Sequence, residues 1–175
     1  MKENNKLECF KAYDVRGQLG RELNEDIAYR VGRAVVQSLE AKTVALGFDA
    51  RETSPSLAKA VASGVCDSGA DVLDIGLAGT EEIYSAVSAF NIDAGIEVTA
   101  SHNPINYNGM KIVKHQSRPL SDQEFLNIKH LAEENNFLRS KRSGSVINKV
   151  SSAREVYVDK ILNFVNLQIL KPLKI

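Results

Sequence analysis

The residues best suited to chemistry lie in one loop, Thr99-Ala-Ser-His-Asn-Pro104, which is followed closely by Tyr107-Asn-Gly-Met-Lys111. A serine, a histidine and a lysine can carry, orient or neutralise a phosphoryl group. The loop follows a segment typical of a strand, and ligands of open α/β sheets bind beyond the carboxyl ends of strands. The alternative is that Asn-Pro and Asn-Gly only build two turns of a connecting loop. Composition alone does not decide between the two.

Several common kinds of site lack their sequence signature. Ser101 is not part of a G-x-S-x-G motif, so ordinary triad chemistry is not indicated. The chain has neither G-x-G-x-x-G nor G-x-x-x-x-G-K-[ST], the usual dinucleotide and P-loop motifs. Cys9 and Cys66 form no C-x-x-C pair and no His-spaced ligand set, which argues against a disulfide framework and a zinc site. His115 and His130 belong to no recognised motif.

Apolar periodicity predicts helices that alternate with short strands. The predicted helices begin at the N-caps Asn24, Ser54, Thr80 and Ser121 and end near Leu39, Gly69, Phe90 and Glu134. The predicted strands are Thr43–Phe48, Val72–Ile75, Ala94–Val98 and Met110–Val113. This alternation predicts a three-layer α/β/α domain with a mixed, largely parallel sheet. The last two strands are joined by a loop without a helix signal, so we expect that pair to be antiparallel.

The chain divides into three parts by composition. Residues 1–134 form the expected domain core, and residues 135–153 are polar, crowded around Gly144, and are predicted to be a linker or loop. Residues 154–175 contain a final helix with Val156, Ile161, Leu162 and Val165, followed by the β-prone segment Leu170–Ile175. An ending of this kind indicates a lead into a further domain that this chain lacks.

Charge and hydropathy exclude some classes of protein. Lys and Arg together number 22, as do Asp and Glu, so no net charge attracts nucleic acid or an anionic membrane. The first seven residues are mostly polar and contain no apolar core, and no stretch reaches the roughly 18 apolar residues of a membrane span. We therefore expect a cytoplasmic protein with neither nucleic acid nor membrane as a partner.

The segment from Gly95 to Pro104, together with Tyr107–Lys111, resembles the phosphoserine loop of the α-D-phosphohexomutase superfamily. The resemblance implies that Ser101 is phosphorylated, gives its phosphate to a hexose phosphate and takes one back from the resulting hexose 1,6-bisphosphate, which also serves as activator. It implies that His102 is a catalytic acid, base or orienting group and that Lys111 neutralises charge during transfer. Asn103 and Asn108 become substrate-binding residues.

Two further segments resemble the same family. Tyr13-Asp-Val-Arg-Gly17 matches a motif whose Tyr13 and Arg16 are implied to line the active-site cleft, with Arg16 suited to bidentate contact with phosphate. The alternative for Arg16 is a surface ion pair with Asp14. Gly47-Phe-Asp-Ala-Arg51 resembles the family's G-x-D-x-R segment, which implies that Arg51 is either a further substrate-binding cation or a brace for the serine loop.

The resemblance also implies a magnesium ion that this chain does not bind alone. In the family the metal lies between the serine phosphate, here on Ser101, and a D-x-D-x-D triplet in the second domain. No such triplet occurs in this sequence, and Asp67, Asp71 and Asp74 have the wrong spacing. We therefore expect an incomplete metal site, a chain that is inactive alone, and the remaining domains of a longer enzyme as its partners.

The resemblance favours a phosphomannomutase that interconverts mannose 6-phosphate and mannose 1-phosphate, with glucose phosphates as possible further substrates. The segment Gly79-Thr-Glu-Glu-Ile-Tyr84 resembles the version in phosphomannomutases of bacterial capsule and lipopolysaccharide pathways, which make GDP-mannose. Three alternatives stay open: a phosphoglucosamine mutase domain, a non-catalytic phosphate- or nucleotide-binding α/β module, and a truncated product that is an interaction partner or a defective gene product.

Overall fold

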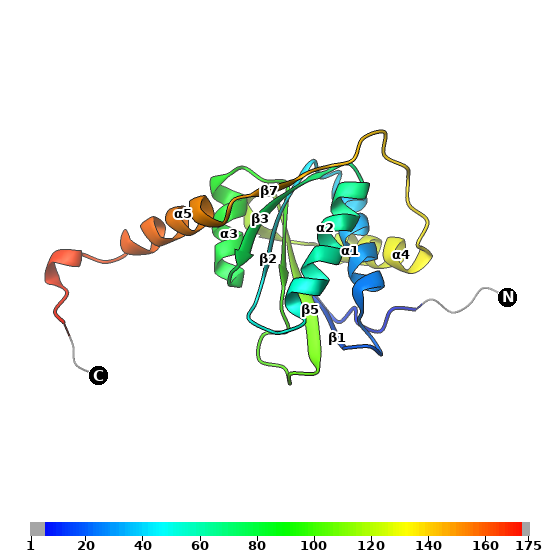
Figure 1. The fold of residues 1–175 in the computed structure, drawn as a ribbon, viewed down its shortest axis with the longest axis horizontal. Helices are drawn as coiled ribbons and strands as arrows, with labels where there is room; N and C mark the ends of the chain where they lie inside the picture. Colours follow the sequence, from blue (N-terminus) through cyan, green and yellow to red (C-terminus); the bar gives the residue numbers. More distant parts are fainter. Residues whose placement is uncertain (1–5, 173–175) are drawn as a thin grey trace.

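The computed structural model describes residues 6–172, and these form a seven-stranded mixed sheet with helices on both faces (Figure 1). The strand order is β1-β5-β4-β2-β3-β7, and β6 pairs with β5 outside this path. The strands are β1 Val15–Gln18, β2 Thr43–Phe48, β3 Asp71–Leu77, β4 Ala94–Val98, β5 Tyr107–Lys114, β6 Arg118–Pro119 and β7 Val146–Asn148. Strands β4, β2, β3 and β7 are parallel, whereas β5 is antiparallel to both β4 and β1. The mixed sheet and the antiparallel pair are confirmed.

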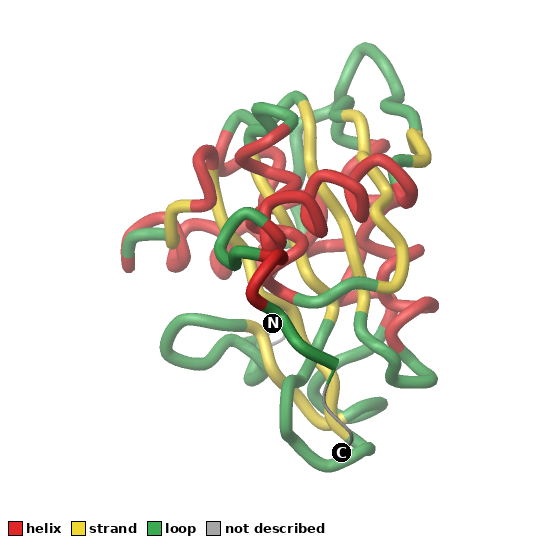
Figure 2. The backbone as a smooth tube through the Cα atoms, turned by 90° about the vertical axis from the view of Figure 1, so that its left-hand side faces the viewer, coloured by secondary structure: helices red, strands yellow, loops and turns green. Residues whose placement is uncertain are grey.

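Two layers of helices complete the three-layer fold. The helices are α1 Glu25–Leu39, α2 Ser54–Asp67, α3 Thr80–Ala89, α4 Asp122–Glu134 and α5 Val150–Leu162. Helices α1, α2 and α4 pack on one face of the sheet over the larger apolar core, and α3 and α5 pack on the other over a smaller one (labelled in Figure 1; Figure 2 shows the same helices and strands from the side). Among the helices of residues 6–172, none is long and apolar enough to cross a membrane.

Strand β4 lies in the middle of the sheet and is buried on both faces. Ile96 and Val98 belong to the core beneath α1 and α2, which is what a central strand between two helix layers requires. On the other face, Gly95 contacts Ile83 and Val87 of α3 closely. The buried strand therefore fixes the position of the loop that follows its carboxyl end.

Two of the predicted helix caps are wrong by one residue. Asn24 caps α1 as predicted, since its Oδ1 accepts from the Ile27 N–H at 2.9 Å. Helix α2, however, has Thr53 at the N-cap position and Ser54 inside the helix. Ser54 does not cap because its hydroxyl donates instead to Asp49 Oδ1 at 2.6 Å. Sequence rules assign a serine before a proline to the cap, but a nearby carboxylate competes for its hydroxyl.

Helix α3 shows the same shift. Its N-cap is Gly79, and Thr80 is the first helical residue. The Gly79 N–H donates to the Glu82 carboxylate at 2.8 Å, so the glutamate supplies the side-chain half of the cap. Of the two acidic residues Glu81 and Glu82, Glu82 therefore has a structural role in capping this helix.

The capping box of α4 is confirmed and leads to a stability prediction. Glu124 accepts from the Ser121 backbone N–H at 2.7 Å and from Lys114 Nζ at 2.8 Å with each oxygen. These hydrogen bonds, first from Lys114 and then from Ser121, lower the pKa of Glu124 from 4.5 to about 2. Because the folded-state pKa is depressed, this stabilisation is present above about pH 4.5 and is lost as the pH falls through about 2.

Glu124→Gln is accordingly expected to lower the free energy of unfolding by about 1 kcal/mol at pH 7. The deficit should shrink as the pH is lowered from about 5, because protonation removes the same interaction from the wild type. Urea unfolding across this range measures it, with Glu134→Gln at an exposed position of the same helix as control. A deficit that stays constant with pH would contradict this assignment.

The prediction of a polar linker or loop over 135–153 is wrong for its second half. Val146–Asn148 forms β7, parallel to β3, and α5 begins at Val150. Backbone bonds anchor both ends of this strand, from the Val72 N–H to Ser145 O and from the Lys149 N–H to Asp74 O, each at 2.8 Å. The strand is exposed at the sheet edge, so its sequence lacks the apolar alternation that reveals half-buried strands. The division of the chain at 134 and 153 stays a prediction.

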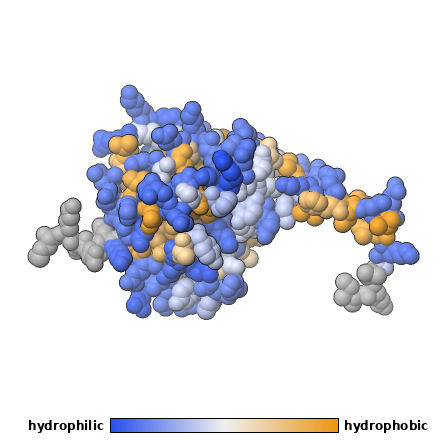
Figure 3. Space-filling model, turned by 180° about the vertical axis from the view of Figure 1, so that it is seen from behind, coloured by the Kyte–Doolittle hydropathy of each residue, from blue (hydrophilic) through white to orange (hydrophobic). Residues whose placement is uncertain are grey.

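The C-terminal part of helix α5 projects away from the body of the domain and carries exposed apolar side chains (Figures 1 and 3). The final helix is confirmed, but it starts earlier than predicted and ends at Leu162, before Val165. Beyond it, Phe164 is 75% exposed and Ile169 is 72% exposed. The predicted segment Leu170–Ile175 lies partly outside the described residues, as does most of the polar stretch at 1–7.

Candidate functional site

The loop that carries Ser101 joins β4 to β5 at the carboxyl end of β4. The loop after β2, residues 49–53, lies beside it, because β2 and β4 are parallel neighbours. The Asp49 N–H donates to Val98 O at 3.0 Å, and the Thr99 N–H donates to Gly109 O at 3.0 Å. The sheet thus places the predicted loop at the edge where ligands of open α/β sheets bind.

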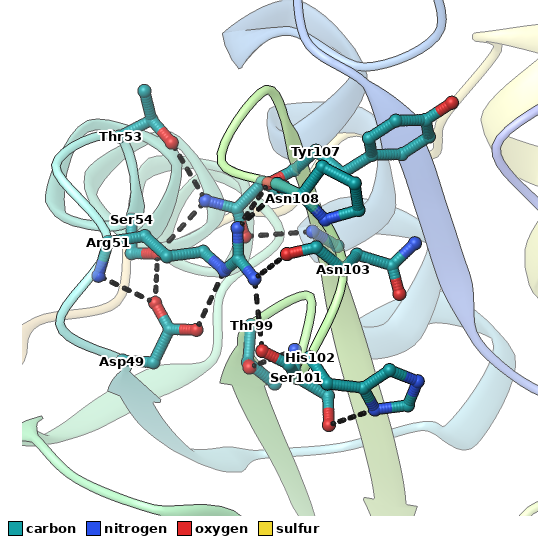
Figure 4. Close-up of polar contacts among 12 residues, drawn as sticks. Asp49, Arg51, Thr53, Ser54, Thr99, Ser101, His102, Asn103, Tyr107 and Asn108 are labelled. Atoms are coloured by element: carbon teal, nitrogen blue, oxygen red, sulfur yellow. Dashed lines mark hydrogen bonds and ion pairs between the residues drawn. The ribbon is translucent and has the colours of Figure 1, made fainter.

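Ser101 is exposed in a strained turn (Figure 4). Its φ is +53°, a left-handed conformation that non-glycine residues adopt rarely, and its N–H donates to Thr99 Oγ1 at 2.8 Å. Its Oγ lies 3.3 Å from Nδ1 of His102, which is also exposed. Ser101 borders an open space of about 560 Å³, here called the serine hollow, which is lined by Asp49, Ala50, Arg51, Ser101, Asn103 and Ile105. The hydroxyl is therefore open to a ligand and has a histidine beside it.

Arg51 braces the serine loop (Figure 4). Its Nη2 donates to the backbone oxygens of Ser101 at 3.0 Å and Asn103 at 2.6 Å. Its Nη1 donates to Pro104 O at 2.9 Å and Tyr107 O at 3.1 Å. The planar fork of one guanidinium therefore fixes four carbonyl groups of an irregular loop. Of the two roles left open by the sequence, the geometry favours the brace.

Asp49 holds Arg51 in place. Its Oδ2 lies 3.4 Å from Arg51 Nε, and its Oδ1 accepts from the Arg51 N–H at 3.0 Å and from the Ser54 hydroxyl at 2.6 Å. The carboxylate thus connects the first turn of α2 to the guanidinium. Sequence reasoning missed this role of Asp49, although the G-x-D-x-R spacing was the signal that could have indicated it.

Asn108 belongs to the same support. It is fully buried, and its Nδ2 donates to Thr53 Oγ1 and Ser54 Oγ, each at 2.9 Å. Its Oδ1 accepts from the Gly109 N–H at 2.8 Å. The amide is occupied within the protein, which favours a structural role over the expected contact with substrate.

Arg16 connects β1 to the serine loop. Its Nη1 donates to Asn103 Oδ1 at 2.9 Å and its Nη2 pairs with Asp14 Oδ2 at 2.6 Å. The ion pair with Asp14 therefore exists, but the same guanidinium also contacts the loop. Tyr13, the other residue of this motif, is 78% exposed.

Lys111 lines a different hollow from Ser101. It is on β5 and lines a second space of about 270 Å³, here called the lysine hollow, with Tyr13, Asp14 and Tyr84 among its other walls. Within residues 6–172, Lys111 Nζ has no hydrogen bond and no ion pair. The structure thus brings Ser101, His102, Asn103 and Arg51 together and leaves Lys111 with Tyr13 in a different hollow.

The residues present do not fit a complete magnesium site. The described part of the chain contains no group of three or more His, Cys, Asp or Glu side chains close enough to hold a metal. Asp49, the carboxylate that lines the serine hollow, is occupied by Arg51 and Ser54. Ser101 alone could contribute one phosphate oxygen, whereas Mg²⁺ prefers octahedral coordination by oxygen.

Glu97 is a buried titratable residue that the sequence analysis did not single out. Its side chain is on β4, the residue is 1% exposed, and neither carboxyl oxygen has a hydrogen-bond partner in the described structure. Burial, followed by the charges of Asp49, Glu82 and Glu81, raises the pKa of Glu97 from 4.5 to about 9. The signal that could have revealed it is a single charge in the otherwise apolar segment Ala94–Val98.

This shift makes stability depend on pH. Between about pH 4.5 and 9, folded Glu97 keeps a proton that the unfolded chain has released, so stability should fall as the pH rises, by up to about 1.4 kcal/mol per pH unit. Glu97→Gln has no such proton, so from pH 6 to pH 8 the wild type should lose roughly 2–3 kcal/mol of unfolding free energy relative to this variant. Chemical unfolding at several pH values measures this difference. Glu155→Gln, an exposed glutamate of α5, should show none, and parallel curves for wild type and Glu97→Gln would refute the shift.

Comparisons with known proteins agree with this arrangement. Residues 7–139 match the family model described as phosphoglucomutase/phosphomannomutase, alpha/beta/alpha domain I. The chain is 50% identical to a phosphomannomutase of Escherichia coli K12 over 171 residues, which cover 97% of the chain and 38% of that relative. It is 54% identical to a phosphomannomutase of Klebsiella pneumoniae over 156 residues, which cover 87% of the chain and 98% of that relative. The chain thus spans 38% of the length of the longer relative.

The fold has a similar counterpart among solved structures. A crystal structure of a phosphoglucomutase/phosphomannomutase family protein from Burkholderia thailandensis superimposes with a TM-score of 0.80 and 32% identity. The match covers 91% of this chain and 36% of that protein. The chain therefore belongs to the phosphoglucomutase/phosphomannomutase family, whose alpha/beta/alpha domain I it contains.

Proposed function

We propose that this chain is the phosphate-carrying domain of a cytoplasmic phosphomannomutase that interconverts mannose 6-phosphate and mannose 1-phosphate. The observation that carries the proposal is the exposed Ser101 hydroxyl, held in a left-handed turn by Arg51 at the edge of an open hollow. The relatives named phosphomannomutase support the choice of mannose, and glucose phosphates are further candidate substrates. The product would supply GDP-mannose for bacterial capsule or lipopolysaccharide.

In the proposed reaction, Ser101 carries a phosphoryl group on Oγ. A hydroxyl oxygen of the hexose phosphate attacks the phosphorus, the bond from phosphorus to Ser101 Oγ breaks, and a hexose 1,6-bisphosphate forms. Ser101 Oγ takes up one proton as the sugar hydroxyl releases one. His102 Nδ1, at 3.3 Å from Oγ, is placed to deliver or accept that proton. After the bisphosphate turns around, its other phosphate returns to Ser101 by the reverse steps, and no net change in phosphate occurs.

The surrounding residues position the serine and balance charge. Arg51 fixes the loop backbone, and Arg16 fixes the side chain of Asn103, which lines the serine hollow that a bound hexose phosphate would occupy. Lys111 is the cation available to an anion in the lysine hollow, beside Tyr13. Magnesium would neutralise the transferring phosphoryl group, and we propose that its carboxylate ligands come from the remaining domains of a longer protein.

A chimera gives the sharpest test of this function. This chain would replace the matching 171 residues of the Escherichia coli relative, and mannose 1-phosphate conversion would be assayed with Mg²⁺ and catalytic hexose 1,6-bisphosphate. We expect turnover by the chimera and none by the 175-residue chain alone. An inactive chimera that folds would favour a non-catalytic module. Preferential competition by glucosamine 6-phosphate would instead favour a phosphoglucosamine mutase.

A further inference from the structure

The buried carboxyl of Glu97 occupies a space that exists because residue 47 is a glycine. Gly47 is the β2 neighbour of Glu97, and a Cβ added there would lie 2.6 Å from Glu97 Oε2. The same Cβ would lie 3.2 Å from a side-chain carbon of Ile75 and 3.3 Å from Cβ of Ala78. The Glu97 side chain therefore leans over β2, into a space closed by β3 and the loop before α3.

Lys111 lies on the opposite side of Glu97. The two residues are directly paired in the antiparallel β4–β5 ladder. Glu97 shares its face of the sheet with Gly95, and Lys111 shares that face with Val113, whose side chain contacts Gly95. The Cβ atoms of residues paired in this way are about 5 Å apart, so opposite charges on their side chains attract each other. The described structure nevertheless contains no ion pair between them.

The charges around Glu97 explain why it does not pair. Those facing it are Asp49 from the end of β2, Glu81 and Glu82 from the start of α3, and Lys111 from β5. Arg154 of α5 lies next to these acidic residues, and its Nε pairs with Glu82 at 2.8 Å. Three acidic neighbours and full burial both oppose a negative charge on Glu97. A neutral carboxylic acid in the Gly47 space satisfies both conditions.

We propose that Glu97 is a positioning residue for Lys111: the Gly47 space holds the Glu97 carboxyl turned away from β5, which leaves the Lys111 ammonium free to bind a phosphoryl oxyanion in the lysine hollow. An ionised Glu97 that turned towards β5 would instead pair with Lys111 and compete with that anion. The nature of the anion rests on the proposed function, whereas the states of Glu97 and Lys111 do not.

The test follows two signals by NMR on the 175-residue chain, the Glu97 side-chain carboxyl carbon and the Lys111 ε-methylene group. In the wild type, the Glu97 signal should be that of a neutral acid at pH 7, and the Lys111 signal should shift on titration with inorganic phosphate. Glu97→Gln keeps the shape and the neutral state, so its phosphate affinity should agree with wild type within about twofold. Glu97→Gln and the Gly47→Ala variant described next are both expected to fold, since the three atoms nearest to a methyl group added at residue 47 all belong to side chains.

Gly47→Ala fills the space and should force the carboxyl towards Lys111, ionise it and weaken phosphate binding at Lys111 by about tenfold. The double variant Gly47→Ala/Glu97→Gln has the same added methyl group but no charge, so it should recover wild-type affinity. A structural effect of the methyl group would not be rescued in this way.

Four results would overturn the proposal. Three of them are an ionised Glu97 in the wild type at pH 7, a tenfold change of phosphate affinity in Glu97→Gln, and a double variant as weak as Gly47→Ala. A Lys111 signal that ignores phosphate in every variant would also overturn it. None of these measurements involves turnover, so a failure of the proposed mutase activity would leave them unchanged, and their failure would leave the role of Ser101 intact.

Discussion

Replacing Ser101 with alanine in the active chimera is expected to reduce hexose phosphate turnover by about 10⁴-fold or more, because no other group takes over an attacking or leaving oxygen. The free energy of unfolding should change by less than about 0.5 kcal/mol, since the side chain is exposed and its hydroxyl has His102 as its single hydrogen-bond partner among residues 6–172. The coupled assay and urea unfolding together measure both quantities. Ser143→Ala, at an exposed position of the loop before β7, is the matched control and should leave turnover unchanged.

Phosphorylation of the protein is a second property by which Ser101→Ala can be compared with the wild type. Incubation with hexose 1,6-bisphosphate should add one phosphate to the wild-type chimera, and peptide mass spectrometry should place it on Ser101. The Ser101→Ala protein should stay unmodified. Residual turnover near the wild-type rate, or a phosphate on another residue, would show that the exposed turn is not the carrier and would remove the basis of the proposed mechanism.

Local sequence patterns were sufficient to predict most of the fold. Strands β2 and β4 begin and end at the predicted residues, because each is a short apolar run bounded by polar loop residues. Helix α4 also has the predicted cap and the predicted last residue, since a capping box fixes its start at Ser121 and a left-handed C-cap at Asn135 ends it after Glu134. The position of the serine loop followed from the order of these elements, because a loop after a central parallel strand must lie at the ligand-binding edge.

The contacts within the site could not be predicted in the same way. Arg51 and the carbonyl groups that it binds are about 50 residues apart, and no local pattern states which donors a guanidinium will use. The burial of Asn108 follows from tertiary packing against α2, whereas its sequence context indicates only a turn. The neutral state of Glu97 depends on burial and on neighbours from β2 and α3. Each of these features exists only once distant elements have packed.

The serine hollow and the lysine hollow contain different functional groups and are connected by the ion pair between Arg16 and Asp14. The serine hollow contains the group that would transfer phosphate, while the lysine hollow contains a cation without a partner among residues 6–172. Arg16 and Asp14 lie between them, with Arg16 bound to the serine loop and Asp14 lining the lysine hollow. The wall of the lysine hollow is therefore joined to the serine loop through the Asp14–Arg16 ion pair and the hydrogen bond from Arg16 to Asn103.

Arg51→Ala is expected to be the most damaging substitution outside Ser101. It removes four hydrogen bonds to the loop backbone and leaves the Asp49 carboxylate without its cation. We expect the free energy of unfolding to fall by about 3 kcal/mol, because breaking a largely buried ion pair leaves an uncompensated charge. Turnover in the chimera should fall by about 100-fold, because a loosely held Ser101 loses its alignment with the substrate.

Arg51→Lys distinguishes the hydrogen bonds that Arg51 makes to the serine loop from its positive charge. Lysine keeps the positive charge beside Asp49 but cannot direct a planar fork at four carbonyl groups, so it should recover part of the stability and little of the turnover. Arg139→Ala, at an exposed arginine after α4, is the control and should change neither quantity. Full recovery of turnover by Arg51→Lys would show that the guanidinium acts as a simple cation near the phosphate. In that case the loop would need another support, and the geometry around Ser101 would not depend on Arg51.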